Sequence, residues 1–583
     1  MTENVSAASG QSQNADGKVK SDLTAANKPD WRKSFASLGN RKLWAVFFLG
    51  FASGLPYVLI TGTLNAWFTN ENIDVKTIGV FSWVIIIYGF KFLWSPLVDR
   101  AAYPAVLSMG QRRAGILLLQ GVIIACLAII STASPQTQIG LIAIAAVLCT
   151  LAASSQDILI DAWRIEIADE NTPIDVLAAV IQLGFRLAAV LGGAFALIIA
   201  ARIGWNDTFR ILAFLMTIAV AGVFIAPNSV IARKATELDE DAPRRTIRNR
   251  VMLPVILFWA WSFYALFSFM GFALQSPEEA NARQFTREVG PLIVLASVVA
   301  PIALSAFLLR YEGTAKVFPN DKAWPAQFAL DALYSFVLAP MMDIIRRLRY
   351  GAILVLILVL SYRFTDLVWG AFAYPFYLGE NFGALGHTND EVAIASKFFG
   401  ALMTLAGIGI GAAALTRFGR MPCLFVGAVI AAATNLLFAD LAVGGARTDA
   451  FMSATGLYVV FGALQPVANF LTLDVNMNEA LSRLMLVIAV ENLAVGFASA
   501  AIVAFLSSIA NPRYAAVQYA LFASLSMLIG SLGRGALGEL IEQEGFAYVF
   551  LLTAALGLVA VVTTALEWLR QTQTGSTGDV TDA

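Results

Sequence analysis

GFASGLPYVLITGTLNAWF, at residues 50–68, is followed after a short polar loop by TIGVFSWVIIIYGFKFLWSPLVDR, at residues 77–100. Both runs are apolar, but Gly54 and Pro56 interrupt the first and Lys91 lies inside the second. Such residues are tolerated at membrane depth where the chain lies against other protein or borders a water-filled cavity. The two runs therefore predict a pair of transmembrane helices that lines a polar cavity.

The composition extends this interpretation to the whole chain. Of the 583 residues, 58% are hydrophobic and 14% are charged, and the mean hydropathy is +0.72. A soluble protein has about 25% charged residues. Apolar runs of about 20 residues, each able to cross a hydrocarbon core of about 30 Å, recur along the sequence. We therefore expect an all-α polytopic membrane protein.

Several function classes are disfavoured by residue content. A net charge of -1 argues against a nucleic-acid partner. Cys126, Cys149 and Cys423 are widely spaced, and His387 is the only histidine, so neither a metal site nor a Ser-His-Asp triad is supported. The sequence has no G-x-x-x-x-G-K-[ST] loop, so we expect no ATP-driven step and no cofactor. If the chain is a transporter, an ion gradient or the gradient of the substrate itself would drive it.

The apolar runs form two sets of six with a further pair between them. The fourteen expected spans are 44–66, 78–98, 114–133, 139–163, 176–200, 208–226, 251–274, 289–309, 351–372, 392–415, 421–441, 484–508, 514–534 and 546–568. The apolar segment 451–473 contains Gln465, Pro466 and Asn469. We expect it to be a re-entrant or surface-lying helix, the alternative being a fifteenth span.

Basic residues predict the orientation of these spans. Lysine and arginine gather in cytoplasmic loops, which places the N-terminus and the C-terminus in the cytoplasm. The residues concerned are Lys33, Arg41, Lys42, Arg100, Arg112, Arg113, Arg233, Lys234, Arg244, Arg245, Arg248, Arg250, Arg346, Arg347, Arg349, Arg417 and Arg420.

This layout predicts five regions and the fold of major-facilitator carriers, whose two six-helix halves are related by a parallel repeat. Residues 1–42 would form a disordered or amphipathic cytoplasmic tail and 43–230 the first bundle. Residues 231–350 would form a charged linker with the inserted helix pair, 351–570 the second bundle, and 571–583 a cytoplasmic tail.

Longer motifs carry a family resemblance. They are GFASGLP (50–56), TLNAWF (63–68), NIDVKTIGVFS (72–82), YGFKFLWSPLVDR (88–100), QRRAG (111–115), SSQDILIDAWR (154–164), GFR (184–186), ENLAVGF (491–497) and VQYALFASL (517–525). Together they resemble the AmpG-type muropeptide permeases, which are major facilitators. The inserted pair 251–309 and the long segment 442–483 depart from that family without interrupting a motif.

The resemblance implies an activity and a location. Members import N-acetylglucosaminyl-1,6-anhydro-N-acetylmuramyl peptides from the periplasm to the cytoplasm for cell-wall recycling, driven by the proton-motive force. It therefore implies a secondary transporter, not an enzyme, in the bacterial inner membrane. The expected partners are the bilayer and an anionic sugar-peptide, and we expect a monomer.

Two cations inside expected spans are candidates for binding the substrate. Arg186 lies near the middle of its span, where its guanidinium matches a carboxylate, and muropeptides carry several carboxylates. Its alternative role is a permanent ion pair with an acid such as Glu491. Lys91 would face the cavity and bind the anionic substrate, or else form a helix-to-helix ion pair.

Uncharged residues complete the expected substrate site. Gln156 and Asn492 are suited to hydrogen-bond sugar hydroxyls or amides, and Trp67 and Trp94 could stack on sugar rings. Tryptophan in such proteins more often anchors a helix at the membrane interface.

Three acids are candidates for carrying the proton. Asp157 and Asp161 share one helix face, so their mutual repulsion would help one of them hold a proton. Glu491 is the candidate in the second half. Asp161 could instead belong to a structural charge cluster at the cytoplasmic mouth. The residues expected at the cytoplasmic gate are Asp99, Arg100, Arg164, Gln518 and Tyr519.

Two other functions stay open at this point. The same fold could carry another anionic solute such as acetyl-coenzyme A. A membrane-embedded enzyme on lipid-linked sugars would need acids clustered on one aqueous face, whereas the acids here are scattered over several spans.

Overall fold

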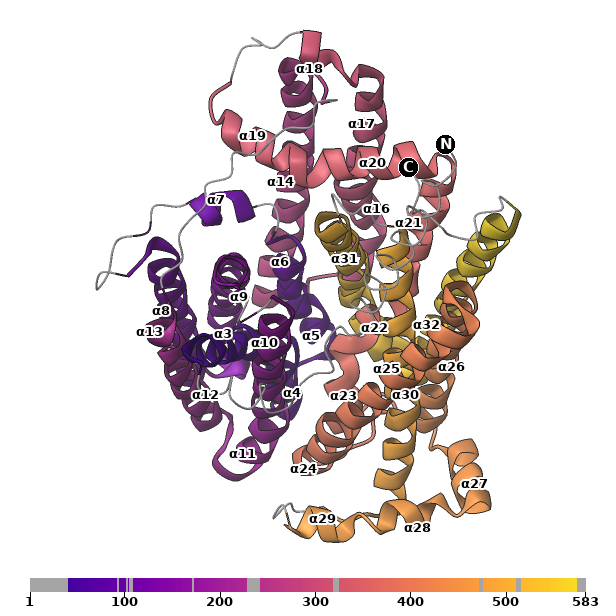
Figure 1. Ribbon diagram of the computed structural model, residues 1–583. Helices are drawn as coiled ribbons and strands as arrows, with labels where there is room; N and C mark the ends of the chain where they lie inside the picture. Colours follow the sequence, from indigo (N-terminus) through magenta and orange to yellow (C-terminus); the bar gives the residue numbers. More distant parts are fainter. Residues whose placement is uncertain are drawn as a thin grey trace, which may run out of the picture.

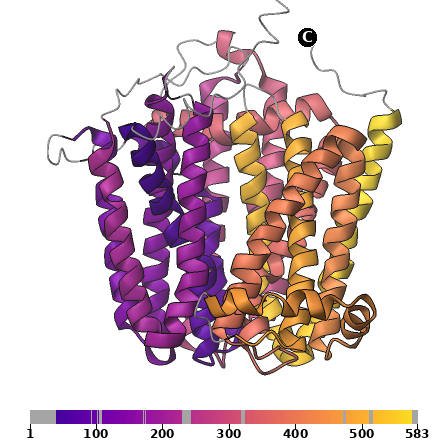
Figure 2. The same cartoon turned by 60° about the horizontal axis from the view of Figure 1, so that its bottom comes forward.

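A computed structural model of the chain describes residues 40–91, 94–100, 103, 109–169, 172, 174–227, 242–317, 324–470, 475–509 and 515–573. Within these ranges the elements are all helices. Figures 1 and 2 show two bundles side by side, one drawn in indigo to purple and the other in orange to yellow. The expected all-α architecture is confirmed.

The first bundle begins with one helix that runs from Arg41 to Asn70 in spite of Pro56. Proline removes a backbone hydrogen bond and crowds the preceding turn, and a π-helical turn (η2) follows it here. The elements of this bundle are α3 (Arg41–Val58), η2 (Leu59–Thr63), α4 (Leu64–Asn70), α5 (Val75–Phe81), η3 (Ser82–Ile85), α6 (Ile86–Gly89), α7 (Ser95–Arg100), α8 (Gln111–Thr132), α9 (Pro135–Glu166), α10 (Ile174–Ala189), η5 (Val190–Phe195), α11 (Ala196–Ile203), α12 (Trp205–Ala219) and α13 (Ala221–Ile225).

Glycines let α3 and α10 cross in close contact. A Cβ atom built on Gly50 would lie 2.3 Å from the carbonyl oxygen of Ile181, and one built on Gly184 would lie 2.2 Å from that of Phe47. Because any side chain at either position would collide with the opposite backbone, the crossing depends on both glycines. Helix α3, which carries the motif GFASGLP (50–56), is thereby fixed against α10, which carries Arg186.

The inserted segment contains more than the expected helix pair. The pair itself consists of α14 (Arg245–Gln275) and a second helix built from α16 (Gly290–Val294), η6 (Leu295–Val299) and α17 (Ala300–Leu308). The other elements are α15 (Ala282–Glu288), η7 (Leu309–Tyr311), α18 (Thr314–Val317), α19 (Gln327–Leu333), η8 (Tyr334–Leu338) and α20 (Ala339–Leu348). In Figure 1, α19 and α20 lie across the top of the picture, while α14 runs downward beside them.

This inserted unit, residues 242–350, contacts both bundles. Phe90 of the first bundle packs edge-on against Trp259 and Phe263 of α14. On the other side, the backbone N–H of Arg283 donates to Glu539 of the second bundle at 2.9 Å. The unit therefore covers one side of the junction between the bundles.

The second bundle ends in a helix that turns back on itself. Its α32 (Arg534–Gln573) has a break at Gly545, whose φ of 82° is one that glycine adopts easily. The other elements are α21 (Gly351–Tyr362), α22 (Phe364–Trp369), η9 (Gly370–Phe372), α23 (Ala373–Leu378), α24 (Asn389–Val392), η10 (Ala393–Phe399), α25 (Gly400–Phe418), α26 (Arg420–Ala442), α27 (Ala446–Thr455), α28 (Leu457–Gly462), α29 (Gln465–Phe470), α30 (Glu479–Ile509) and α31 (Ala515–Leu532).

The expected count of fourteen spans is not confirmed. Among the described residues, 12 helices are long and apolar enough to cross a membrane. The expected spans 78–98 and 351–372 correspond to the shorter helices Val75–Gly89 and Gly351–Tyr362. The expected spans 514–534 and 546–568 fall in the single stretch Ser524–Gln573. Conversely, Gln327–Leu348 has the length of a span but contains the amphipathic α20 and lies across the bundles.

The segment 451–473 is broken into short helices. Gly456, with φ of 70°, separates α27 from α28, and α29 follows after a turn. In Figures 1 and 2 these helices lie across the lower end of the second bundle. Residues 471–473 lie outside the described ranges. The described part agrees with the surface-lying alternative and not with a fifteenth span.

The bundles have two ends, which we name by their residues. The basic face is the end that carries Lys42, Arg112 and Arg347, and the far face is the end that carries Asn70 and Asp390. On the basic face, Arg112 forms an ion pair with Glu166 of the same bundle at 2.8 Å. The far face instead holds polar contacts that join one bundle to the other.

Candidate functional site

The side chains of Lys91 and Asp157 form an ion pair between two segments of the first bundle. Lys91 lies just after the end of α6 and Asp157 lies in α9, and Nζ is 3.6 Å from Oδ2. The Ser53 hydroxyl of α3 also hydrogen-bonds the Asp157 carboxylate. Lys91 remains 35% exposed although it is paired. The structure shows the ion-pair alternative for Lys91, with the side chain partly exposed, and binding of an anionic substrate by Lys91 stays a prediction.

Two more of the expected site residues lie beside this ion pair. The indole N–H of Trp94 donates to Ser155 at 3.2 Å, next in sequence to Gln156. Gln156 is fully buried, and among the described residues its amide oxygen and nitrogen have no hydrogen-bond partner. Its hydrogen-bonding capacity is therefore unused in this conformation.

Arg186 lies on α10 with its side chain exposed. Among the described residues its guanidinium has no hydrogen bond or ion pair, so the structure does not place it against Glu491. The neighbouring Phe185 packs on Tyr57, whose ring in turn contacts Tyr88 at a centroid distance of 5.1 Å. An exposed guanidinium with no hydrogen bond or ion pair among the described residues is able to bind an anionic group.

Glu491 and Asn492 form a second polar group, on α30. The Asn492 amide donates to Glu491 Oε2 at 2.7 Å and to the carbonyl of Ile488 at 2.9 Å, and it accepts from the Thr404 hydroxyl at 2.8 Å. These contacts hold the two side chains against α25. They belong to the second bundle, whereas the Lys91–Asp157 pair belongs to the first.

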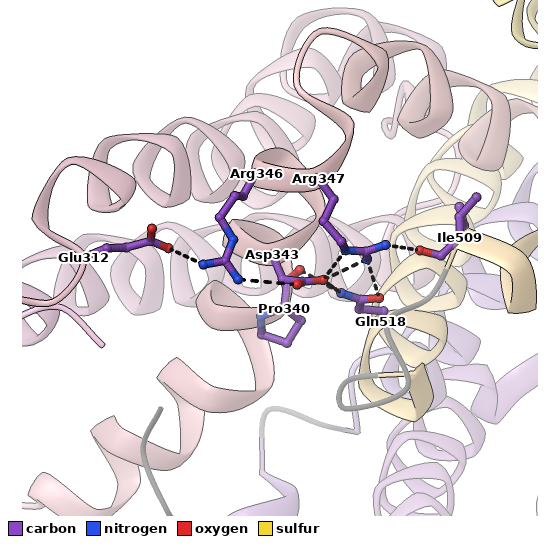
Figure 3. Close-up of polar contacts among 7 residues, drawn as sticks. All are labelled: Glu312, Pro340, Asp343, Arg346, Arg347, Ile509 and Gln518. Atoms are coloured by element: carbon purple, nitrogen blue, oxygen red, sulfur yellow. Dashed lines mark hydrogen bonds and ion pairs between the residues drawn. The ribbon is translucent and has the colours of Figure 1, made fainter. Parts of the chain in front are cut away.

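The expected gate residues divide into two places. Asp161, which is exposed, and Arg164, which is half-buried, form an ion pair at 3.4 Å near the basic end of α9. Gln518, by contrast, is buried and donates to Asp343 of α20 at 2.7 Å, so it connects α31 to the inserted unit (Figure 3). The side chains of Asp99, Arg100 and Tyr519 lie outside the described part of the structure.

Trp67 lies in the aromatic core of the first bundle, and not at a surface where it could stack on a sugar ring. The ring is 1% exposed and packs against Trp205 and Phe209, while its N–H reaches Glu71 at 3.4 Å. It therefore presents no exposed face to a ligand in this conformation. Sequence alone could not distinguish a stacking surface from an aromatic core contact.

The structure adds charged residues that sequence reasoning overlooked. Lys397 lies inside the expected span 392–415, so the argument used for Lys91 applied to it as well, and its ammonium sits 4.9 Å from the centroid of the Tyr374 ring. Arg534 is the last residue of the expected span 514–534, and its guanidinium donates to the Leu367 carbonyl at 2.6 Å.

An ion pair between the bundles was also missed. Arg202 of α11 and Asp390 of α24 form two hydrogen bonds, of 3.0 and 2.9 Å. Asn389 also donates to Asn70 at 2.9 Å. Asn65 adds a 3.1 Å bond to the carbonyl of Ala371. These contacts close the far face, and only three-dimensional packing reveals them because the partners are far apart in sequence.

The chemistry of this arrangement is binding and ion-pair exchange. Among the residues that the structure describes, no group of three or more His, Cys, Asp or Glu side chains could hold a metal ion. The described acids and cations are instead distributed over two bundles that meet at the far face.

Comparisons with known proteins agree with this architecture. A scan against protein-family models finds no match. The anhydromuropeptide permease of Escherichia coli K12 is 27% identical over 531 residues, which cover 90% of this chain and 80% of that protein. A transporter of Rickettsia felis named AmpG 4 is 24% identical, covering 89% of this chain and 95% of the other.

Solved structures show the fold alone. The POT family transporter PepTSo superposes with a TM-score of 0.56 at 14% identity, covering 92% of this chain and 98% of that one. The nucleoside transporter NupG, as its D323A mutant, superposes with a TM-score of 0.51 at 13% identity, covering 90% of this chain and 99% of that one. The expected major-facilitator architecture is confirmed.

Proposed function

Because the chain is a multi-pass membrane transporter, not an enzyme, and is related along 90% of its length to the anhydromuropeptide permeases, we propose that it imports anhydro-muropeptides together with protons. The cargo would be N-acetylglucosaminyl-1,6-anhydro-N-acetylmuramyl peptides, moved from the periplasm to the cytoplasm across the inner membrane. The similarity to the Escherichia coli permease is the observation that carries this proposal.

The distribution of basic residues supports the direction. With lysine and arginine on the cytoplasmic side, the basic face is cytoplasmic and the far face periplasmic. The Arg202–Asp390 and Asn389–Asn70 contacts would then join the two bundles at the periplasmic end.

Cations on the first bundle suit an anionic sugar-peptide. Arg186 is free to bind a peptide carboxylate through two parallel hydrogen bonds. The partly exposed Lys91 supplies a second cation, and Trp94 and Gln156 lie beside it. On the second bundle, Asn492 would contribute hydrogen bonds to sugar hydroxyls or amides once it exchanges its present partners.

Competition between the Asp157 carboxylate and a substrate carboxylate for Lys91 would couple substrate binding to protonation of Asp157. While Asp157 is ionised it holds Lys91 by charge. Protonation of Asp157 removes that attraction and frees the ammonium for a substrate carboxylate. Proton and substrate would therefore bind together and leave together, which is the property of a symporter. Glu491 is the corresponding candidate in the second bundle.

Uptake into proteoliposomes tests the proposal. Radiolabelled anhydro-muropeptide should accumulate when a proton gradient is imposed, and a protonophore should abolish the accumulation. Asp157→Asn should lose gradient-driven accumulation while keeping exchange of labelled for unlabelled cargo, because exchange needs no net proton movement. Arg210→Gln, at an exposed site, is the matched control and should behave as the wild type.

Two results would contradict the proposal. Accumulation that is unchanged by the protonophore would disprove proton coupling. Uptake of acetyl-coenzyme A with no uptake of muropeptide would show that the protein carries a different cargo from the one proposed.

A further inference from the structure

A groove of about 850 Å³ lies between the inserted unit and the second bundle. Its walls come from α17, α20, α21 and α31, and they are apolar, with Ala303, Phe522 and Leu525 among them. The volume is in the range of small-molecule sites. None of the residues proposed for transport lines this groove, so it is distinct from the proposed transport site.

The end of the groove at the basic face is lined by polar side chains. Arg346, Arg349 and Tyr350 lie there, at the end of α20 and the start of α21. Tyr350 is 94% exposed and Arg346 is 52% exposed. Among the described residues the guanidinium of Arg349 has no hydrogen bond or ion pair. An apolar groove with cations at one end is suited to bind an amphiphile that has acyl chains and an anionic head group.

The local charge favours an anionic head group. Figure 3 shows Arg346 reaching between Glu312 and Asp343, at 3.6 and 3.9 Å. Asp343 itself is engaged more closely by Arg347 at 2.8 Å and by Gln518 at 2.7 Å. The arginines here are Arg346, Arg347 and Arg349, and the carboxylates are those of Glu312 and Asp343. Three positive charges against two negative charges leave one positive charge in excess. A single phosphodiester carries the charge that balances it.

We propose that this groove binds an anionic glycerophospholipid from the cytoplasmic leaflet, with its phosphate on Arg346 and Arg349 and an acyl chain along α17 and α31. Arginine recognises phosphate through paired hydrogen bonds, and basic pockets between membrane helices bind anionic lipid head groups. A zwitterionic lipid would bring a further cation to a site that already has an excess of them.

The contacts of α20 explain what the lipid would hold in place. Arg347 donates to the carbonyl of Ile509, at the end of α30, and its neighbour Asp343 accepts from Gln518 at the start of α31 (Figure 3). The groove borders α31 beside these contacts, so the lipid would lie against the joint between the inserted unit and the second bundle.

The test uses the purified full-length protein in detergent with defined lipids. Dioleoyl phosphatidylglycerol should bind in native mass spectrometry and raise the melting temperature, whereas dioleoyl phosphatidylcholine should do neither. Combining Arg346→Gln with Arg349→Gln should weaken phosphatidylglycerol binding by about tenfold or more, because a charge-assisted hydrogen bond contributes about 1.5–3 kcal/mol. Arg417→Gln, an exposed arginine elsewhere on the basic face, should leave binding unchanged.

A second variant separates the groove from the arginines. Ala303→Trp would fill the groove and should reduce lipid binding while Arg346 and Arg349 remain. Equal binding of the two lipids, or an unchanged affinity in the double glutamine variant, would overturn the proposal. Inorganic phosphate that reproduces the thermal shift alone would also overturn it, because the site would then be an anion site without acyl recognition.

Discussion

Lys91 and Asp157 illustrate how one ion pair can serve transport because it is only partly buried. A fully buried pair would be permanent, since separating its members leaves an uncompensated charge. With Lys91 35% exposed and Nζ 3.6 Å from the carboxylate, the attraction is screened and the contact is long. The ammonium can therefore exchange one carboxylate for another.

At the residue scale, Arg186→Lys should lower the rate of muropeptide uptake by about tenfold. Lysine keeps the charge but loses the planar fork that binds a carboxylate bidentately. Initial rates over a range of substrate concentrations measure the effect, and Arg210→Lys is the control for an exposed arginine. If Arg186→Lys transported as well as the wild type, a bidentate anchor at this position would be excluded.

Two buried glutamines give a matched pair of stability predictions. Gln120 and Gln518 are both 0% exposed, but among the described residues only the Gln518 side chain has hydrogen-bond partners. A buried polar group without a partner costs about 1–3 kcal/mol, so Gln120→Leu should raise the melting temperature. Gln518→Leu should lower it because Asp343 and Pro340 lose a donor. Destabilisation by Gln120→Leu would reveal a bound water or another partner.

Charged candidates could be predicted from sequence better than aromatic ones. A lysine or an arginine inside an apolar run is costly unless it is paired or solvated, and this rule identified Lys91 and Arg186. It applied equally to Lys397, which was overlooked. Trp67 could not be assigned because a tryptophan has no such requirement, and its contact with Trp205 depends on how two distant helices pack.

At the scale of the element, the crossing of α3 and α10 should not tolerate a side chain. Gly50→Ala would place a Cβ 2.3 Å from the Ile181 carbonyl, and overpacking of this kind costs about 1–3 kcal/mol. The melting temperature in detergent should fall. Gly121→Ala on α8 is the control, because nothing lies within 4 Å of the position that its new methyl group would take, and it should be neutral. Equal melting temperatures for the two variants would disprove the tight crossing.

Hydrophobic runs predicted which helices exist more reliably than how each one lies. The long spans follow from hydropathy, which reports only the preference for lipid over water. The amphipathic α20 belongs to a stretch of transmembrane length that lies across the bundles, with Asp343 buried and Arg346 exposed. Its position depends on the contact with Gln518, which no local pattern encodes.

At the scale of the whole molecule, Asp390→Ala should favour the conformation that is open at the far face. The Arg202–Asp390 pair joins the bundles, and loss of a partly buried ion pair should shift the equilibrium by about 1–3 kcal/mol, which is about 5- to 150-fold. A cysteine replacing Asn65, which is 1% exposed at the junction, reports opening through its rate of reaction with a membrane-impermeant maleimide.

The control for this prediction is another ion pair on the same face. Asp207 and Arg210 lie within one bundle, and both are exposed, so Asp207→Ala should leave the labelling rate unchanged. The three native cysteines are buried, which keeps background labelling low. Equal labelling rates in the Asp390→Ala variant and the wild type would show that this pair does not hold the far face closed.

The inserted unit makes the two sides of the moving junction unequal. On one side Phe90 packs on α14 and Arg283 binds Glu539, whereas on the opposite side η5 meets η10 directly, with no inserted helix in front of them in Figure 2. If the two bundles move relative to each other during transport, one side of their junction moves against the inserted unit and the other side moves against lipid acyl chains. Membrane viscosity and thickness would therefore act on turnover mainly through the uncovered edge.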